Sequence, residues 1–468
     1  MAPFQKYQTP TASKALGRAP SNKAFQQLVI NAVLVNLIDP VRGKPTKDSL
    51  EGSLDEGIIP LYQLKQKFLD SFALICATSG SGKETASAVC LEQTQGSSSI
   101  LRVARNRGLP DNDLKRLKEV LHFLVAVAEK RKTSTQAEGE LLKIIVKLDE
   151  HRILSLVQKI SKLAKPGLRQ CLRLAVSNTS NGAHKQGILD DADFRQWLQT
   201  CPFGDTALNL SGSSQLATVV QWASEARWKY SQQLQALLDC NATSSPPWVE
   251  TLHKVARYTA AIKSMIKFAV KQPAVFADIH IMALEAPPPE IFPPPHGGTL
   301  LRDALTRLLR GEPHDTMEKL ARVLVTVDVE AAMRKACTLT LTLHAEMQLL
   351  GFYDQNEHLI PNLRLMGTSK KACFLCHEFL IKHPLQLRVG ACHQKVYPTW
   401  RPPFSGDFHR GPRSQMWWAF SRKIESEAVK ALKTELGGSR RPINRDSTAG
   451  PTLTATATAL TPALALGR

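Results

Sequence analysis

Apolar residues recur at helical spacing through most of the chain between residues 25 and 272. The clearest stripe runs from Leu114 to Ala128, where apolar positions three and four apart predict an amphipathic helix. The same periodicity predicts helices in 141–163, around Trp197, in 222–238 and in 248–270. We therefore expect a large, mainly helical N-terminal region.

The pattern changes after residue 272. Val275 to Leu284 is short and rich in apolar and β-branched residues, which predicts a strand. Residues 286–298 follow, with six prolines between Pro287 and Pro295, and this density predicts an extended loop. Helical patterns return at 300–309 and 317–329.

These changes divide the chain into four expected parts. They are a flexible basic tail (1–24), the helical region (25–272), a second domain (273–436, with the proline-rich loop 286–298) and a disordered tail (437–468).

Composition narrows the class of protein. Lys and Arg outnumber Asp and Glu by 60 to 41 in 468 residues, a net charge of +19 that favours polyanionic partners such as nucleic acid. No apolar run approaches the roughly 18 residues that cross a bilayer, so we expect no membrane partner. Nine scattered cysteines are not typical of a secreted disulfide scaffold. We expect an intracellular protein, cytoplasmic or nuclear; a mitochondrial presequence in the basic stretch before Asp39 is the alternative.

A phosphate-loop lookalike occurs at Leu74–Glu84 (LICATSGSGKE). The nucleotide-binding motif needs Gly where this chain has Ala77, and Ser or Thr where it has Glu84. A carboxylate at the second position would repel the phosphates. We interpret the segment as a Gly/Ser turn between an apolar segment and a helix.

The strongest chemical signal combines two short motifs. His344-Ala345-Glu346 is an H-x-E, and Cys373 and Cys376 form a C-x-x-C. By chance, both motifs would occur in this order and at a comparable separation only about 0.003 times. Catalytic zinc sites use three N or S ligands and keep a fourth position for water, and one His with two Cys supplies such a set.

The flanking sequences explain how these residues reach one site. Residues two apart in a helix point away from each other, but at a strand-to-helix junction His344 and Glu346 can share a site. Thr338–Leu343 is strand-like and 345–350 favours helix. Likewise 363–367 predicts a strand that leads into a cysteine-bearing helix.

The start of that helix also has candidate capping residues. Thr368 and Ser369 precede the two cysteines and are the expected N-caps. The two half-motifs should then meet at one edge of a sheet, where two helices begin.

At these residues the chain resembles the zinc-dependent cytidine deaminase superfamily, whose signature is H-x-E followed by P-C-x-x-C. It is most similar to a mostly fungal deaminase-like subgroup with a long helical N-terminal region, over about 338–425 (HAEMQLL…LRLMGTSKKACFLCHEFL…RVGACHQKVYPTW). Ala372 replaces the proline of the signature.

The resemblance implies a fold and an activity. The expected fold class is α + α/β: a helical N-terminal region followed by a three-layer α/β/α domain with a mixed sheet of about five strands. His344, Cys373 and Cys376 would hold Zn²⁺, and Glu346 would move protons while zinc-bound hydroxide displaces ammonia from a nucleobase. Two strands are expected ahead of His344, and 275–284 and 338–343 are the candidates.

Substrate contacts are predicted around this core. Between Asn362 and Lys423, eleven Lys and Arg stand against Glu378 and Asp407, interleaved with aromatic residues. This composition suits a nucleic-acid or nucleotide substrate. Candidate substrate-binding residues are Ser369, Lys370, His393 and Trp400, whereas Trp417 and Trp418 are expected in the core.

Two alternatives stay open. Cys373, Cys376, Cys392 and His393 are the candidates for a closed structural zinc site. In the second alternative, the chain is a catalytically inactive protein that has the deaminase fold and a structural zinc ion and binds nucleic acid or protein. The helical region could bind protein partners, and the sequence does not fix an oligomeric state.

Overall fold

The fold combines a mixed β-sheet with many helices. The computed structural model describes residues 23–47, 59–81, 84–93, 98–176, 191–203, 212–238, 246–295, 297–311, 313–403 and 412–441. In the first half of the chain, the helices are α1 (Lys23–Ile38), α2 (Ile59–Ile75), α3 (Asp111–Ala128), α4 (Ser134–Leu148), α5 (Glu150–Val176), α7 (Ala192–Gln199), α8 (Ser213–Trp228), α9 (Ser231–Leu237) and α10 (Pro247–Lys271).

The second half alternates shorter elements. Its helices are α11 (Leu300–Leu309), α12 (His314–Leu324), α13 (Val329–Ala336), α14 (Ala345–Gln355), α15 (Phe374–Lys382) and α16 (Pro412–Lys430), with helical turns η2 (Pro273–Phe276), η3 (Glu357–Leu359) and η4 (Ala431–Glu435). The strands of the whole chain are β1 (Thr46–Lys47), β2 (Ser87–Gln93), β3 (Ser99–Arg105), β4 (Ile279–Ala283), β5 (Glu290–Ile291), β6 (Thr340–Leu341), β7 (Leu365–Thr368), β8 (Arg388–Val389) and β9 (Ala391–Cys392).

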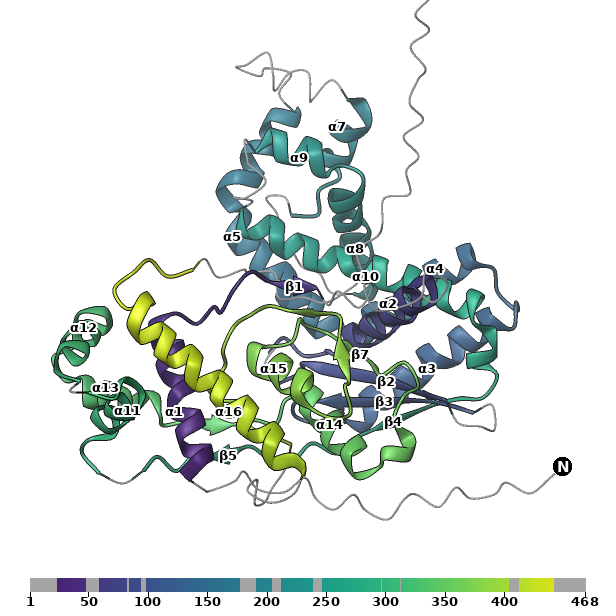
Figure 1. The fold of residues 1–468 in the computed structure, drawn as a ribbon. Coiled ribbons are helices and arrows are strands. Elements are labelled where there is room, and N and C mark those ends of the chain that lie inside the picture. Colours follow the sequence, from purple (N-terminus) through teal and green to yellow (C-terminus); the bar gives the residue numbers. More distant parts are fainter. Residues whose placement is uncertain are drawn as a thin grey trace, which may run out of the picture.

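Five strands form one sheet in the order β4-β3-β2-β7-β8 (Figure 1). Strand β2 is antiparallel to both of its neighbours, with Ser87 opposite Arg105 of β3 and Ala88 opposite Thr368 of β7. The outer pairs, β3 with β4 and β7 with β8, are parallel. This mixed sheet with helices confirms the expected α + α/β class.

The sheet separates two apolar cores. Alternate residues of β2 and β3 face opposite sides, so Val89 and Val103 join one core whereas Ala88 and Ala104 join the other. The first core contains residues of α2, α3, α4, α5, α8 and α10. The second contains residues of α1, α11, α13, α14, α15 and α16. Helices therefore cover both faces, which gives three layers.

Two strands of the sheet come from the region expected to be helical. The strands ahead of His344 are β2 and β3, with β4 at the edge of the sheet, whereas 338–343 contributes only the short β6 of a separate two-stranded pair. This corrects the expected division at residue 272, because residues 25–272 and 273–436 share one sheet. Strand β2 is buried on both faces, so its sequence lacks the alternation that marks a half-exposed strand.

Several helices follow their predicted stripes, and others are interrupted. The predicted helices at 114–128, 248–270 and 300–309 correspond to α3, α10 and α11. The predicted helix at 141–163 is two helices, because α4 ends at Leu148 and α5 starts at Glu150. In the proline-rich loop, β5 pairs with β6. Among the described residues, no helix combines the length and the apolar character needed to cross a membrane.

Helix α2 packs directly on strand β7. A Cβ atom at Gly367 would overlap the backbone of Leu69, so only glycine permits this close approach. The Asp70 carboxylate accepts the Thr368 N–H at 2.8 Å, which fixes the end of β7 against the helix. Burial raises the pKa of Asp70 to about 7, although the hydrogen bonds from Thr368 and Gln66 lower it.

The substitution Asp70→Asn should reduce the dependence of stability on pH between about 4 and about 7. Folded Asp70 keeps its proton up to about pH 7, whereas the unfolded chain releases it near 3.8, so the contribution of Asp70 to the free energy of unfolding falls as the pH rises through this window. The asparagine oxygen can still accept the Thr368 N–H. Urea unfolding of both proteins across the window measures the difference, and identical pH profiles would contradict it.

Candidate metal centre

His344 lies at the junction between an extended segment and helix α14. It is the N-cap residue, with extended backbone angles (φ −64°, ψ 151°), and Glu346 is in the first turn. The Ala345 N–H donates to the Asn106 side chain at 2.8 Å, and Gln348 donates to the carbonyls of Arg105 and Leu343. The expected strand-to-helix junction is therefore present, and the residue after β3 holds it in place.

The two cysteines lie at the start of helix α15, but the helix is capped differently from the prediction. Cys373 is itself the N-cap, and its sulfur accepts the Cys376 N–H at 3.3 Å. The predicted caps are elsewhere: Thr368 ends β7, and the Ser369 hydroxyl accepts the Ser87 N–H at 2.9 Å. The expectation was wrong because the chain continues extended past Ser369, where Ala372 bonds the Ala391 carbonyl, and turns into helix only at Cys373.

His344, Cys373 and Cys376 form one cluster of possible metal ligands. The His344 Nδ1 atom is 3.6 Å from the Cys373 sulfur and 3.3 Å from the Cys376 sulfur. In the described part of the chain, this is the only set of at least three His, Cys, Asp or Glu whose ligand atoms lie within 4.8 Å of one another. Ligand atoms on a tetrahedral zinc ion are about 3.6–3.8 Å apart, so the cluster fits such an ion.

The charges in the cluster are strongly coupled. Burial raises the pKa of the Cys373 thiol, but hydrogen bonding with Cys376 and the nearby His344 outweigh burial and bring it well below its usual value. Burial and the Cys373 charge raise the pKa of Cys376. Burial lowers the pKa of His344, but the attraction of Cys373 dominates and raises it. A thiolate beside an imidazole is a donor set that borderline-soft metal ions prefer.

Glu346 lies beside this cluster and is buried. Burial raises the pKa of its carboxyl, whereas the charge of His344 and a hydrogen bond with Cys376 lower it. A carboxyl whose pKa is raised can hold and release a proton nearer neutral pH than a free Glu. The arrangement brings a proton-exchanging group to the candidate ligands.

His393 and Tyr397 form a wall next to the cluster. The His393 Nδ1 atom accepts the Lys395 N–H at 3.0 Å, and burial lowers the pKa of His393 to about 4. The ring of Tyr397 lies edge-on to His393 (5.4 Å between centroids) and to His344 (6.4 Å). Tyr397 is 38 % exposed, so it lies at the rim. His393 was predicted from the sequence, whereas Tyr397 was not; its only signal was that an aromatic residue follows His393 by four positions.

The other candidate substrate residues differ in position. Trp400 is buried, packed between Phe379 and Phe420, so its ring faces are covered. Ser369 is also buried and joins β7 to β2. Lys370 is partly exposed, and its charge acts on the pKa of His344, so it lies near the cluster.

The alternative closed site is not assembled. The Cys392 sulfur accepts the Gln394 N–H, and His393 uses its Nδ1 for Lys395. Neither belongs to the cluster of ligand atoms found in the described residues. Cys373 and Cys376 converge with His344 instead.

An N-terminal strap, residues 39–47, covers the backbone of the wall. Strand β1 pairs with β9, the Arg42 N–H donates to the Gln394 carbonyl, and the Val396 N–H donates to the Pro40 carbonyl, both at 2.8 Å. The strap therefore fixes the segment that carries His393. Pairing over such a separation in sequence has no local signal, so it could not be predicted from the sequence.

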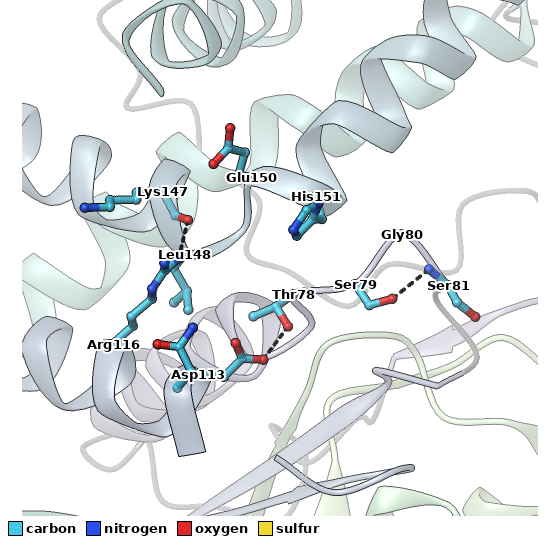
Figure 2. A pocket seen from close by; sticks show the side chains of 11 residues that line it. Thr78, Ser79, Gly80, Ser81, Asp113, Arg116, Lys147, Leu148, Glu150 and His151 are labelled. Atoms are coloured by element: carbon cyan, nitrogen blue, oxygen red, sulfur yellow. Dashed lines mark hydrogen bonds between the residues drawn. The ribbon is translucent and has the colours of Figure 1, made fainter. Parts of the chain in front are cut away.

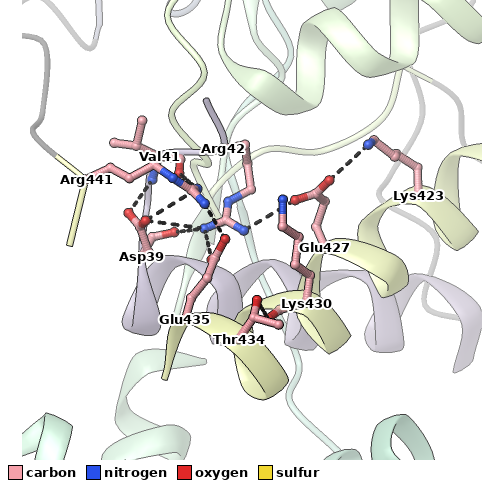
Figure 3. A network of polar contacts seen from close by, with 9 residues as sticks. All are labelled: Asp39, Val41, Arg42, Lys423, Glu427, Lys430, Thr434, Glu435 and Arg441. Carbon is pink, nitrogen blue, oxygen red and sulfur yellow. Dashed lines mark hydrogen bonds and ion pairs between the residues drawn. The ribbon is translucent and has the colours of Figure 1, made fainter. Parts of the chain in front are cut away.

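Arg42 anchors the strap to the end of helix α16 (Figure 3). Its buried guanidinium donates to Glu435 at 2.8 Å, to Glu427 at 3.3 Å and to the Asp39 carbonyl at 2.6 Å. Arg441 pairs with Asp39 at 3.4 Å and also with Glu435. The network joins the first and last described helices behind the wall.

The Gly/Ser turn lies away from the cluster. Thr78–Ser81 line an open cavity of about 680 Å³ together with the start of α3 and the junction of α4 and α5 (Figure 2). Asp113 and Glu150 also line it, and the Asp113 carboxylate accepts hydrogen bonds from Thr78 and Arg105. Gly82 and Lys83 lie outside the described residues, and the turn leads into strand β2, where a helix was expected.

Comparisons with known proteins agree with the geometry. Residues 343–404 match the family model of an OTT_1508-like deaminase. The matched stretch contains His344, Glu346, both cysteines of the cluster and the wall. None of the curated proteins and none of the solved structures matched this chain.

The substitution Arg42→Ala should lower the free energy of unfolding by about 1.5–3 kcal/mol, because it removes the buried cation shared by Glu427 and Glu435 and leaves only Lys423 and Arg441 to pair with them. Chemical denaturation measures this change. The control is Arg131→Ala, which removes an exposed ion pair with Glu129 and should cost at most about 1 kcal/mol. Equal effects of the two substitutions would show that the buried network has no special weight.

Proposed function

We propose that the chain is a zinc-dependent hydrolase that removes the amino group of a nucleobase in nucleic acid or a nucleotide, on the premise that residues 343–404 match the model of a deaminase family. The observation that carries the proposal is the convergence of His344, Cys373 and Cys376 with a buried carboxyl beside them. Family membership alone would not distinguish an enzyme from an inactive relative. The presence of Glu346 favours the enzyme.

The donor set suits zinc. One imidazole nitrogen and two sulfurs are the ligands that zinc prefers, and three protein ligands leave a coordination position open. Zinc bound there would lower the pKa of a water molecule to about 7 and so supply a nucleophile at neutral pH. The hydrogen bond from the Cys376 N–H to the Cys373 sulfur holds that ligand in position.

Glu346 would carry the protons. Hydrolytic deamination forms a C–O bond to the oxygen of water and breaks the C–N bond to the amino group, which leaves as ammonia. Glu346 accepts a proton from the attacking water and returns it to the nitrogen side of the substrate. Its raised pKa suits both directions of transfer.

The surrounding residues would position the base. His393 is held neutral by burial, and Tyr397 offers the partly exposed ring at the rim, so a planar heterocycle can pack against them. Lys370 is a candidate partner for a phosphate. Ser369 and Trp400 would support the site without touching the substrate, because both are buried.

The first test is metal content. We expect about one zinc per chain in the purified protein, and a substantial loss of zinc in His344→Ala and Cys376→Ala. Atomic emission or absorption of dialysed samples measures it. Cys392→Ala is the matched control, a buried cysteine close to the wall but outside the cluster, and it should retain the metal. Loss of zinc from this control as well would argue against the three-ligand site.

The second test is ammonia release with Glu346→Gln. The variant should retain zinc and lose activity by roughly 10²–10⁴-fold on whichever of single-stranded DNA, RNA or free nucleosides the wild type deaminates. Glu378→Gln is the control, because Glu378 forms a salt bridge with Lys382 along α15. Zinc-loaded wild type that is inert on every substrate would instead support an inactive, deaminase-fold binding protein.

A further inference from the structure

A groove lies between helices α1 and α16, with Arg307 of α11 at its side. Its volume is about 820 Å³, and its lining includes Gln27, Asn31 and Trp418. A second hollow of about 560 Å³ shares Gln27 and Arg307 with it. The two hollows are therefore neighbours beside α1, the helix that lies next to α16 (Figure 1).

Trp418 is the exposed aromatic residue of this groove. Trp417 is 3 % exposed, as expected for a core residue, but Trp418 is 62 % exposed, and the prediction that it lies in the core was wrong. Successive helical residues point about 100° apart, so only one of the two can face the core. The Arg422 guanidinium lies 5.2 Å from the centre of the Trp418 ring.

Helix α16 and its continuation carry positive charge on their outer face. Arg422, Lys430 and Lys433 are exposed. The acidic residues of this segment are already paired with other cations, namely Glu425 with Arg307, Glu427 with Arg42 and Lys423, and Glu435 with Arg42 and Arg441. The exposed cations therefore attract an external anion.

This charged face leads toward the candidate metal centre. Helix α16 begins near the far ends of α14 and α15, where Arg413 pairs with Asp354. Its other end contacts Arg42, whose backbone bonds Gln394 next to His393. Residues 418–433 span about 22 Å at helical rise. A ligand along this face would reach the strap that covers the back of the wall.

We propose that the α16 face binds single-stranded nucleic acid, with a base stacked on Trp418 and phosphates paired with Arg422, Lys430 and Lys433. The choice of ligand rests on the proposed function, since the contacts would hold a strand whose target base enters the metal centre. A single strand fits better than a duplex, because an exposed aromatic ring needs an unstacked base. Polar side chains of the groove lining, such as Gln27 and Gln415, can bond to base edges or to the backbone of the strand.

Fluorescence anisotropy with a labelled single-stranded oligonucleotide tests the proposal on the full chain. Trp418→Ala should weaken binding about 5- to 150-fold, the range for loss of one stacked base, and Trp418→Phe should retain most of the affinity. The double substitution Arg422→Gln with Lys430→Gln should reduce the slope of log affinity against log salt by about 1.4, or about 0.7 per lost phosphate contact.

The matched control removes the same charge elsewhere. Lys115→Gln with Lys118→Gln acts on two exposed lysines of α3 and should leave affinity and salt slope nearly unchanged. Equal effects of both double variants, unchanged binding by Trp418→Ala, or preference for duplex or for an acidic polypeptide would each overturn the proposal. Circular dichroism verifies that the variants are folded.

The outcome is separable from the proposed activity. Strand binding that depends on Trp418, without ammonia release, supports the surface and counts against the deaminase. Deamination of free nucleosides together with Trp418-independent binding supports the deaminase and overturns the surface.

Discussion

His344 and Cys373 can meet only because helices α14 and α15 both begin at the same end of the sheet. The antiparallel pairing of β2 with β3 and β7 places Ser87 opposite Arg105 and Ala88 opposite Thr368 at that end. From there, the residue after β3 holds the first N–H of α14, and Ser369 after β7 bonds the start of β2. These contacts set the distance between imidazole and sulfurs before any ion binds.

The end of the sheet where α14 and α15 begin must also be buried while the cluster stays accessible from outside. The backbone of the wall is covered from behind by the strap, and the strap depends on a single buried guanidinium shared by three partners. Tyr397 leaves the rim partly open. Charged groups are disfavoured where little water reaches them, and burial is therefore the largest cause of the shifted pKa values of Glu346, His393 and Asp70.

The site was largely predictable from the sequence, and the sheet was not. H-x-E and C-x-x-C are local patterns whose residue types carry their chemistry, so the structure brings His344 together with the two cysteines as expected. Strands β2 and β3 were overlooked because a strand buried on both faces shows no alternation, and their partners are more than 170 residues away for β4 and more than 260 for β7. The N-cap was misplaced because a cysteine sulfur took the part usually played by Ser or Thr.

The periodicity of a helix also says little about which core of the protein the helix packs into. The apolar stripe of α10 was evident from the sequence. The sequence did not show that this stripe packs into the core on one face of the sheet, and residues 25–272 were therefore expected to form a separate part. Trp418 shows the same limit at a smaller scale, since two adjacent tryptophans in a helix must point in different directions and composition does not say which one is buried.

The Arg42 network has a consequence for the order in which the protein matures. During synthesis, the strap emerges from the ribosome nearly 390 residues before Glu427 and Glu435, the carboxylates that neutralise its guanidinium. Until helix α16 has been made, Arg42 has only the Asp39 carboxylate, 3.8 Å away, as a counter-charge, and the strap over the segment at 391–396 lacks its anchor. The wall is therefore among the last parts of the molecule to become rigid.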